Sequence, residues 1–295
     1  MMITTNPFQN INQRNKPLLL DGAMGSYLQQ KGYETDDVLW TAKPNLIQPD
    51  AIRNIHKDYI DAGADIITTN TFRTNPAALL KSGINDLSVY VSEAVSLAKQ
   101  ATEGKKVLIA GSNPPAEDCY QRARALTNNQ LEMNHKQHID LLIDNGVDFI
   151  LNETQSHLDE IKIICQHCDG NAIPYVLSLY LDEKLKLLSG ESFEFIISFL
   201  KEHNSLAIGI NCISPELFTR IVGSINLPEN WGFYLNCGSG KPTDHIIHCG
   251  VSPDEYIKLV KESLQFHPSF IGACCGSSPK HIRKIRDFLD ERYSS

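Results

Sequence analysis

The chain has 295 residues, of which 42% are hydrophobic and 21% are charged, and its formal net charge is −8. This composition is typical of a globular protein, and the excess of acidic residues argues against a nucleic-acid partner. The sequence lacks an apolar run of the roughly 20 residues that cross a bilayer, and its first residues lack the apolar core of a signal peptide. We therefore expect a cytoplasmic protein that binds neither membranes nor nucleic acids.

Eight short β-rich runs recur along the chain, and stretches with helical periodicity separate them. The runs lie in residues 17–25 and 64–72 and then end at Ser112, Thr154, Tyr180, Cys212, Gly240 and Gly276. Most are nearly continuous in apolar residues, as in parallel strands that are covered on both faces. The repeat of roughly 36 residues suits an eightfold barrel. The pattern predicts a single (β/α)8 TIM barrel over residues 1–295, with residues 1–16 as an N-terminal extension.

The placement of reactive residues favours this closed barrel over a doubly wound open sheet, which could show the same alternation. In a barrel all the strand ends meet on one rim, whereas the first and eighth strands of an open sheet need not meet. We therefore expect an active site at the C-terminal rim, overhung by the loops of residues 22–50 and 113–129. The residues that directly follow predicted strands are Asp21, Asn70, Thr71, Glu153, Cys212, Asn236, Cys274 and Cys275.

Three cysteines predict a metal site with an open position. Cys274 and Cys275 are adjacent between Gly272 and Gly276, and Cys212 closes another predicted strand two units earlier. Adjacent side chains on a strand point to opposite faces, so both reach one point only where the strand ends and the backbone turns. Three thiolates suit Zn²⁺ with a fourth position free for substrate. An incoming thiol would lose its proton there near neutral pH.

The remaining cysteines are expected to be thiols, because disulfides are rare in a reducing compartment. Cys119, Cys165, Cys168 and Cys249 are expected to pack as small apolar residues. Cys165 and Cys168 have the C-x-x-C spacing of redox and zinc motifs, but the pattern around them is helical and no matching pair occurs elsewhere in the sequence.

Asp21 and Glu153 are candidate substrate ligands. Each could instead cap a helix or form a surface ion pair, but two carboxylates on one rim suit a substrate with a positive amine. The glycines that follow Asp21, Gly22 and Gly25, leave backbone N–H groups free to bind a substrate carboxylate. A glycine-rich turn after a strand also suggests phosphate binding, although the longer G-x-G-x-x-G pattern is absent.

Five segments in order, DGAMGSYL, TTNTF, NET, GINC and GACCG, resemble the homocysteine S-methyltransferase family of zinc barrels. The spacing of GINC and GACCG is the most specific part of the resemblance. It implies that Cys212, Cys274 and Cys275 bind zinc and that homocysteine sulfur takes the open position. It also implies that Asp21 and Glu153 bind the amino-acid end of homocysteine.

The seventh predicted strand holds a further candidate and the main departure from the family. In some relatives an asparagine of this strand occupies the open zinc position without substrate, and Asn236 falls where that residue would. Many relatives continue with serine, glycine and glutamate, whereas this chain continues with Cys237, Gly238 and Ser239. The role of the glutamate is unfilled, and Cys237 is either a further ligand or a small residue that replaces serine.

The resemblance implies direct methyl transfer, in which a zinc-bound homocysteine thiolate attacks the methyl group of an onium donor and gives methionine. No general base is needed for that step. Because the chain carries no cobalamin or folate module, we expect a sulfonium donor, S-methylmethionine or S-adenosylmethionine. Betaine is the alternative, with Trp40, Tyr27, Tyr33 and Phe72 as candidates for an aromatic cage. Another thiol or selenol is an alternative acceptor.

Two readings from other classes stay open at this stage. Glu153 could activate a metal-bound water in a zinc hydrolase, although an all-sulfur ligand set is a poor Lewis acid. The barrel could also be a non-catalytic subunit that zinc stabilises.

Overall fold

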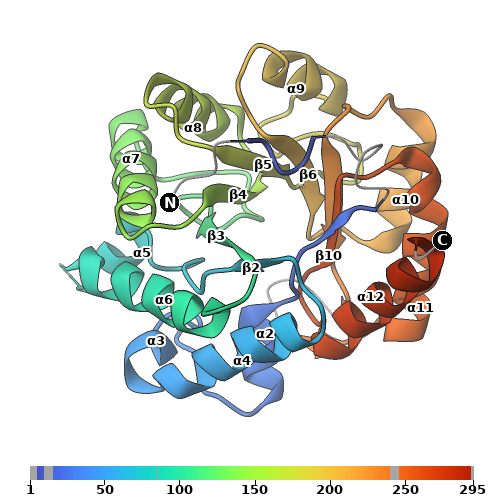
Figure 1. Cartoon of the computed structure of the whole chain (residues 1–295). Coiled ribbons are helices and arrows are strands. Elements are labelled where there is room, and N and C mark those ends of the chain that lie inside the picture. Colours follow the sequence, from blue (N-terminus) through green and yellow to red (C-terminus); the bar gives the residue numbers. More distant parts are fainter. Residues whose placement is uncertain (1–4, 10–15, 85, 240–245, 294–295) are drawn as a thin grey trace.

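Parallel strands close into a barrel that helices surround, as Figure 1 shows. The computed structural model describes residues 5–9, 16–84, 86–239 and 246–293. The order of strands around the sheet is β1-β10-β7-β6-β5-β4-β3-β2. The barrel strands are β1 (Leu18–Leu19), β2 (Ile66–Thr68), β3 (Leu108–Asn113), β4 (Phe149–Gln155), β5 (Tyr175–Leu179), β6 (Ala207–Asn211), β7 (Trp231–Leu235) and β10 (Phe270–Ala273).

The two ends of the sheet meet between β1 and β2. A parallel bridge joins Leu20 to Ile66. The Asp65 N–H donates to the Leu19 carbonyl at 2.7 Å, and the Asp21 N–H donates to the Ile66 carbonyl at 3.0 Å. These bonds complete the ring, and the predicted eightfold barrel is confirmed.

Helices follow the strands and cover the outside of the barrel (Figure 1). Within the described ranges, every helix is too short or too polar to span a lipid bilayer. One of these helices, α4, is amphipathic and buries Ile52, Ile55 and Tyr59 against the barrel. The helices are α2 (Met24–Gln30), α3 (Pro44–Ile47), α4 (Pro49–Asp61), α5 (Pro76–Lys81), α6 (Leu87–Thr102), α7 (Asn128–Asp144), α8 (Leu158–Gly170), α9 (Phe193–Leu200), α10 (Pro215–Ser224), α11 (Pro253–Ser263), the 3₁₀ turn η1 (Leu264–Phe266) and α12 (Pro279–Tyr293).

The strand predicted to end at Gly240 is shorter than expected. It ends at Leu235, and Gly240 lies outside the described residues. The Asn236 side chain accepts the Gly238 N–H at 2.8 Å, which turns the chain away from the barrel. Gly238–Ser239 (β8) then pairs antiparallel with His248–Cys249 (β9).

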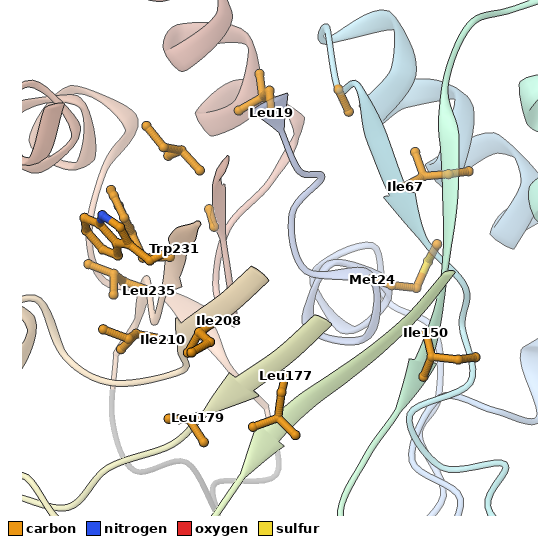
Figure 2. Close-up of a cluster of buried hydrophobic side chains, with 14 of the residues drawn as sticks. Leu19, Met24, Ile67, Ile150, Leu177, Leu179, Ile208, Ile210, Trp231 and Leu235 are labelled. Carbon is orange, nitrogen blue, oxygen red and sulfur yellow. The ribbon is translucent and has the colours of Figure 1, made fainter. Parts of the chain in front are cut away.

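Alternating side chains of the strands build two apolar layers. The outer layer packs between the sheet and the helices, and Figure 2 shows Leu177 and Leu179 of β5 beside their register partners Ile208 and Ile210 of β6. The inner layer fills the barrel. Its members include Leu20, Ile66, Ala110, Phe149, Leu151, Val176, Ala207, Tyr234 and Phe270.

Phe8, which lies in the segment expected to be an extension, belongs to this inner layer. It is 2% exposed, and its ring centroid lies 5.5 Å from that of Phe149 and 5.4 Å from that of Phe270. The neighbouring Asn6 side chain donates to the Leu206 carbonyl at 2.8 Å. Phe8 therefore fills part of the barrel core.

We predict that Phe8→Ala lowers the free energy of unfolding by about 3–5 kcal/mol, because it empties a buried aromatic site. The free energy is measured by urea unfolding. Phe195→Ala is the matched control, since Phe195 is 51% exposed on α9, and it should change the value by about 0.5 kcal/mol or less. Equal effects of the two substitutions would show that Phe8 does not support the core.

Candidate functional site

A cavity of about 350 Å³ opens among the carboxyl ends of the barrel strands. Its lining includes side chains from the ends of several strands and from the loops after β1, β2 and β3, as expected for a barrel rim. The predicted site residues that line it are Asp21, Gly22, Glu153, Cys212, Cys274 and Cys275.

The three predicted metal ligands converge in this cavity. The sulfur atoms of Cys212, Cys274 and Cys275 all lie within 4.8 Å of one another, and those of the adjacent pair lie 4.0 Å apart. Among the described residues, this is the one cluster of histidine, cysteine and acidic side chains with the spacing of a metal site. The two strands that carry the cysteines, β6 and β10, are separated only by β7.

The backbone at the strand ends places these sulfurs. Cys212 directly follows β6 and has a φ of 54°, a left-handed conformation that a non-glycine residue rarely adopts. The Cys274 N–H still donates to the Leu235 carbonyl at 2.8 Å, and the left-handed Gly276 then turns the chain. A Cβ on Gly276 would lie 2.5 Å from the Gly238 Cα, so this turn requires glycine. Both adjacent cysteines therefore face the cavity, as predicted.

Cys212 and Cys274 are joined in a disulfide, and Cys275 is a free thiol. This pairing differs from the expectation that Cys212 and Cys274 are metal ligands rather than disulfide partners. It follows from the convergence that brings two strand ends within bonding reach. A disulfide sulfur lacks the negative charge of a thiolate ligand. The disulfide and a three-thiolate metal site are therefore alternative states of the same residues.

The other cysteines divide into buried and exposed ones. Cys119, Cys165 and Cys168 are buried, as expected, and the last two lie on helix α8. Cys249 is exposed on β9, so the expectation that it packs in the core is wrong. Cys237 is fully buried in the apolar core, with its sulfur 3.7 Å from the Leu235 carbonyl.

The cavity holds two carboxyl groups whose charged forms are disfavoured. Burial raises the pKa of Asp21 to about 8, and the charge of Glu153 adds to the shift. Burial also raises the pKa of Glu153 to about 7. Asp21 accepts hydrogen bonds from the N–H and the hydroxyl of Thr68, both at 2.8 Å, while the Ser112 hydroxyl donates to Glu153. A cationic ligand would favour ionisation of both carboxyl groups.

A β-bulge places Glu153. The register between β4 and β5 shifts between Asn152 and Gln155, and Thr154 has a φ of 59°. Asn211 holds this conformation, because it accepts the Thr154 N–H at 3.0 Å and donates to the Thr154 hydroxyl at 2.8 Å. Asn211 is also the last residue of β6 and directly precedes Cys212, so the residue that supports the backbone beside Glu153 adjoins a predicted metal ligand.

Some residues singled out from the sequence lie elsewhere. Asn236 is partly buried, and its side chain is engaged with the Gly238 N–H rather than with the cavity. Of the four candidate cage aromatics, Trp40 and Phe72 line the cavity with ring centroids 6.1 Å apart. Tyr27 instead packs beside Tyr59, and Tyr33 packs against the core.

The cavity also includes residues that the sequence did not single out as site residues. Arg73, Asp118, Tyr120 and Tyr234 line it, together with the buried Cys119. Three of them lie in the loop after β3, which was expected to overhang the rim. The sequence predicted that this loop overhangs the rim but not which of its side chains enter the cavity. The direction of each loop side chain depends on tertiary contacts.

A closed parallel barrel with a cavity of sulfur and carboxyl groups at its strand ends has the architecture of a barrel enzyme. Comparison with known proteins identifies the kind of enzyme. A model of the family "Homocysteine S-methyltransferase" matches residues 18–289. The chain therefore belongs to the homocysteine S-methyltransferase family, and the resemblance seen in its motifs is confirmed.

Individual relatives agree over the full length of the chain. Homocysteine S-methyltransferase of Escherichia coli is 26% identical over 97% of this chain and 99% of its own. Betaine-homocysteine S-methyltransferase of Drosophila melanogaster is 26% identical over 96% of this chain and 97% of its own. The crystal structure of the E. coli homocysteine methyltransferase MmuM, described as its metallated form, superposes with a TM-score of 0.79. It is 25% identical, covering 96% of this chain and 99% of that one.

The donor set fits a thiophilic cation once the disulfide is reduced. Burial, with the charge of Glu153, raises the pKa of the Cys275 thiol to about 12. That thiol stays neutral at physiological pH unless a bound cation offsets the cost of its negative charge. Three such sulfurs at one point are the ligands that Zn²⁺ prefers.

The raised pKa of Asp21 predicts a pH dependence of stability. Folded Asp21 keeps a proton up to about pH 8, whereas the unfolded residue loses it near its ordinary value of 3.8. The folded state therefore binds more protons in this window, and its stability falls as the pH rises. We expect the unfolding free energy of the metal-free wild type, relative to Asp21→Asn, to fall by about 1 kcal/mol per pH unit between pH 4 and 8.

Denaturant unfolding at several pH values measures this difference. The buried His56 and His138, whose pKa values burial lowers to about 3, contribute equally to both proteins. The difference therefore reports Asp21 together with its interaction with Glu153. Parallel curves for the two proteins would contradict the prediction.

Proposed function

We propose that this protein is a zinc-dependent homocysteine S-methyltransferase that uses a sulfonium donor, S-methylmethionine or S-adenosylmethionine, and forms methionine. The observation that carries the proposal is the convergence of Cys212, Cys274 and Cys275 in one cavity with two buried carboxyl groups. Membership of the family supports the acceptor and the reaction. The E. coli relative, whose structure is described as metallated, supports a bound metal.

Cys212, Cys274 and Cys275 in their reduced form would hold the zinc ion. Bound there, Zn²⁺ favours the thiolate form of an incoming thiol near neutral pH. In the reduced protein, the left-handed Cys212 and the turn at Gly276 would hold the three sulfurs close together. The protein thus provides a preorganised set of ligands.

Asp21 and Glu153 would bind the ammonium group of homocysteine. Both face the cavity, and each has lone pairs beyond those used by Thr68 and Ser112. The backbone of Gly22 would approach the substrate carboxylate. A Cβ on Gly22 would lie 2.7 Å from the Ser277 hydroxyl, so the close packing behind this segment excludes a side chain. Asn236 would join the site only if its side chain released the Gly238 N–H.

The reaction moves a methyl group between two sulfur atoms. The thiol proton leaves to solvent, the acceptor sulfur forms a bond to the methyl carbon, and the bond from that carbon to the donor sulfonium breaks with its electron pair. A thiolate and a sulfonium thereby become two neutral thioethers. Because charge disappears on the way to the transition state, a cavity with little water favours the transfer. The chain's task is to hold both substrates in line at attack distance.

Betaine is the second candidate donor. Trp40, Phe72 and Tyr120 line the cavity and present aromatic rings that could surround a quaternary ammonium. The Drosophila relative bears the name of a betaine-dependent enzyme. We favour a sulfonium because two of the four aromatic residues proposed for a cage, Tyr27 and Tyr33, pack outside the cavity.

The test is methionine formation by the reduced, zinc-loaded protein from homocysteine, with S-methylmethionine, S-adenosylmethionine or betaine supplied separately. We expect turnover with a sulfonium donor and its loss in Cys275→Ala. Cys165→Ala is the matched control, because Cys165 is buried on α8 away from the cavity, and it should keep its activity. Turnover with betaine alone would replace the proposed donor, and silence with all three would contradict the proposed reaction.

A further inference from the structure

The charges that line the cavity are unbalanced. Among the described residues in the lining, five side chains carry carboxyl groups and one carries a fixed positive charge. The cation is Arg73. The carboxyl groups belong to Asp21, Asp36, Asp37, Asp118 and Glu153.

Two of the acidic side chains that line the cavity, Asp36 and Asp118, have other partners. Asp36 is bound to Lys43 at 2.5 Å and accepts the Val38 and Leu39 N–H groups at 2.9 and 2.8 Å. Asp118 accepts the Tyr120 N–H at 2.9 Å. These contacts stabilise the loops that carry the acidic side chains.

Arg73 itself takes part in no ion pair among the described residues. Its guanidinium carbon lies 5.5 Å from the centroid of the Phe72 ring, and Nη1 donates a long bond of 3.4 Å to the Glu117 carbonyl. Neither contact neutralises the charge, but both limit the direction of the side chain, which is half-buried. A directed guanidinium without a counterion, facing a cavity, is suited to bind a carboxylate through two parallel hydrogen bonds.

We propose that Arg73 binds the carboxylate of the methyl donor, so that the site selects a sulfonium that also carries a carboxylate, as a methylated amino acid does. This inference rests on the proposed function and adds the donor's recognition group to it. The donor's positive sulfur would lie among the aromatic rings of Trp40 and Phe72, whose faces attract cations.

The position of Arg73 assigns it to the donor rather than to homocysteine. Its two contacts, Phe72 and Glu117, belong to the loops after β2 and β3. The groups proposed for homocysteine, Asp21 and Glu153, lie at the strand ends, on the side of the cysteines. Arg73 therefore lies among loop residues, whereas the groups proposed for homocysteine lie at the strand ends.

The experiment compares two donors that differ only in the carboxylate. S-Methylmethionine and its decarboxylated analogue, the aminopropyl dimethylsulfonium ion, are titrated into the zinc-loaded protein by calorimetry, and the KM of each is measured where there is turnover. Arg73→Met removes the charge and keeps apolar contact with Phe72. Arg122→Met is the matched control, because Arg122 lies on the same loop as Asp118, pairs with Asp182 at 2.6 Å and lies outside the cavity lining.

We expect Arg73→Met to weaken binding of S-methylmethionine roughly 10- to 100-fold, as loss of a charged hydrogen-bonding partner does. Binding of the decarboxylated ion and the KM of homocysteine should change by less than about threefold. Arg73→Lys should restore part of the affinity, and Arg122→Met should match the wild type.

Three results would overturn the assignment of Arg73. They are an equal loss of affinity for both donors, a change confined to the KM of homocysteine, and no binding of S-methylmethionine by the wild type. Arg73-dependent binding without methionine formation would instead contradict the proposed reaction and leave the assignment standing. Methionine formation that is unchanged by the Arg73 substitution would support the proposed reaction and contradict the assignment of Arg73.

Discussion

Closure of the barrel is the constraint on which the rest of the structure depends. The backbone bonds between Leu19, Asp21, Asp65 and Ile66 join the ends of the sheet. Because the ring is closed, residues from the first and last strands share one rim with those of β4 and β6. One cavity thus receives sulfurs that lie two strand positions apart and carboxyl groups that lie far apart in the sequence. No special strand order is needed.

Local backbone conformation then converts this general rim into a specific site. Cys212 and Thr154 both adopt left-handed φ values, which cost free energy in non-glycine residues. The buried Asn211, which directly precedes Cys212 in the chain, stabilises the conformation of Thr154 through two hydrogen bonds. Strain at these two strand ends therefore coincides with the positions of a metal-ligand candidate and a substrate-ligand candidate.

The cavity is arranged to receive charge rather than to hold it. Burial raises the pKa values of Asp21, Glu153 and Cys275 and so disfavours the charged form of each group. A metal ion and an ammonium group would each reverse this preference at the residues they contact. Binding of both charged partners is thereby coupled to ionisation of the residues that hold them.

Much of this arrangement could be predicted from the sequence, since alternation of apolar runs and helices specifies a barrel and strand ends specify the rim. The adjacent Cys274 and Cys275 were recognisable because glycines flank them. The early end of β7 was not recognisable in the sequence, because it depends on a hydrogen bond between Asn236 and Gly238.

Other features depend on contacts between residues far apart in the chain, which periodicity does not encode. Phe8 precedes the first strand, and only its contacts with Phe149 and Phe270 reveal it as a core residue. The role proposed for Arg73 depends likewise on which loop side chains turn into the cavity and which already have partners.

The metal content of the reduced protein shows most directly whether the three converging cysteines hold zinc. We predict about one zinc ion per chain in the wild type and in Cys165→Ala, because Cys165 is remote from the cavity. Cys275→Ala should lose the metal while its far-ultraviolet circular dichroism stays that of the wild type. Full zinc content in Cys275→Ala, or none in the reduced wild type, would contradict the account.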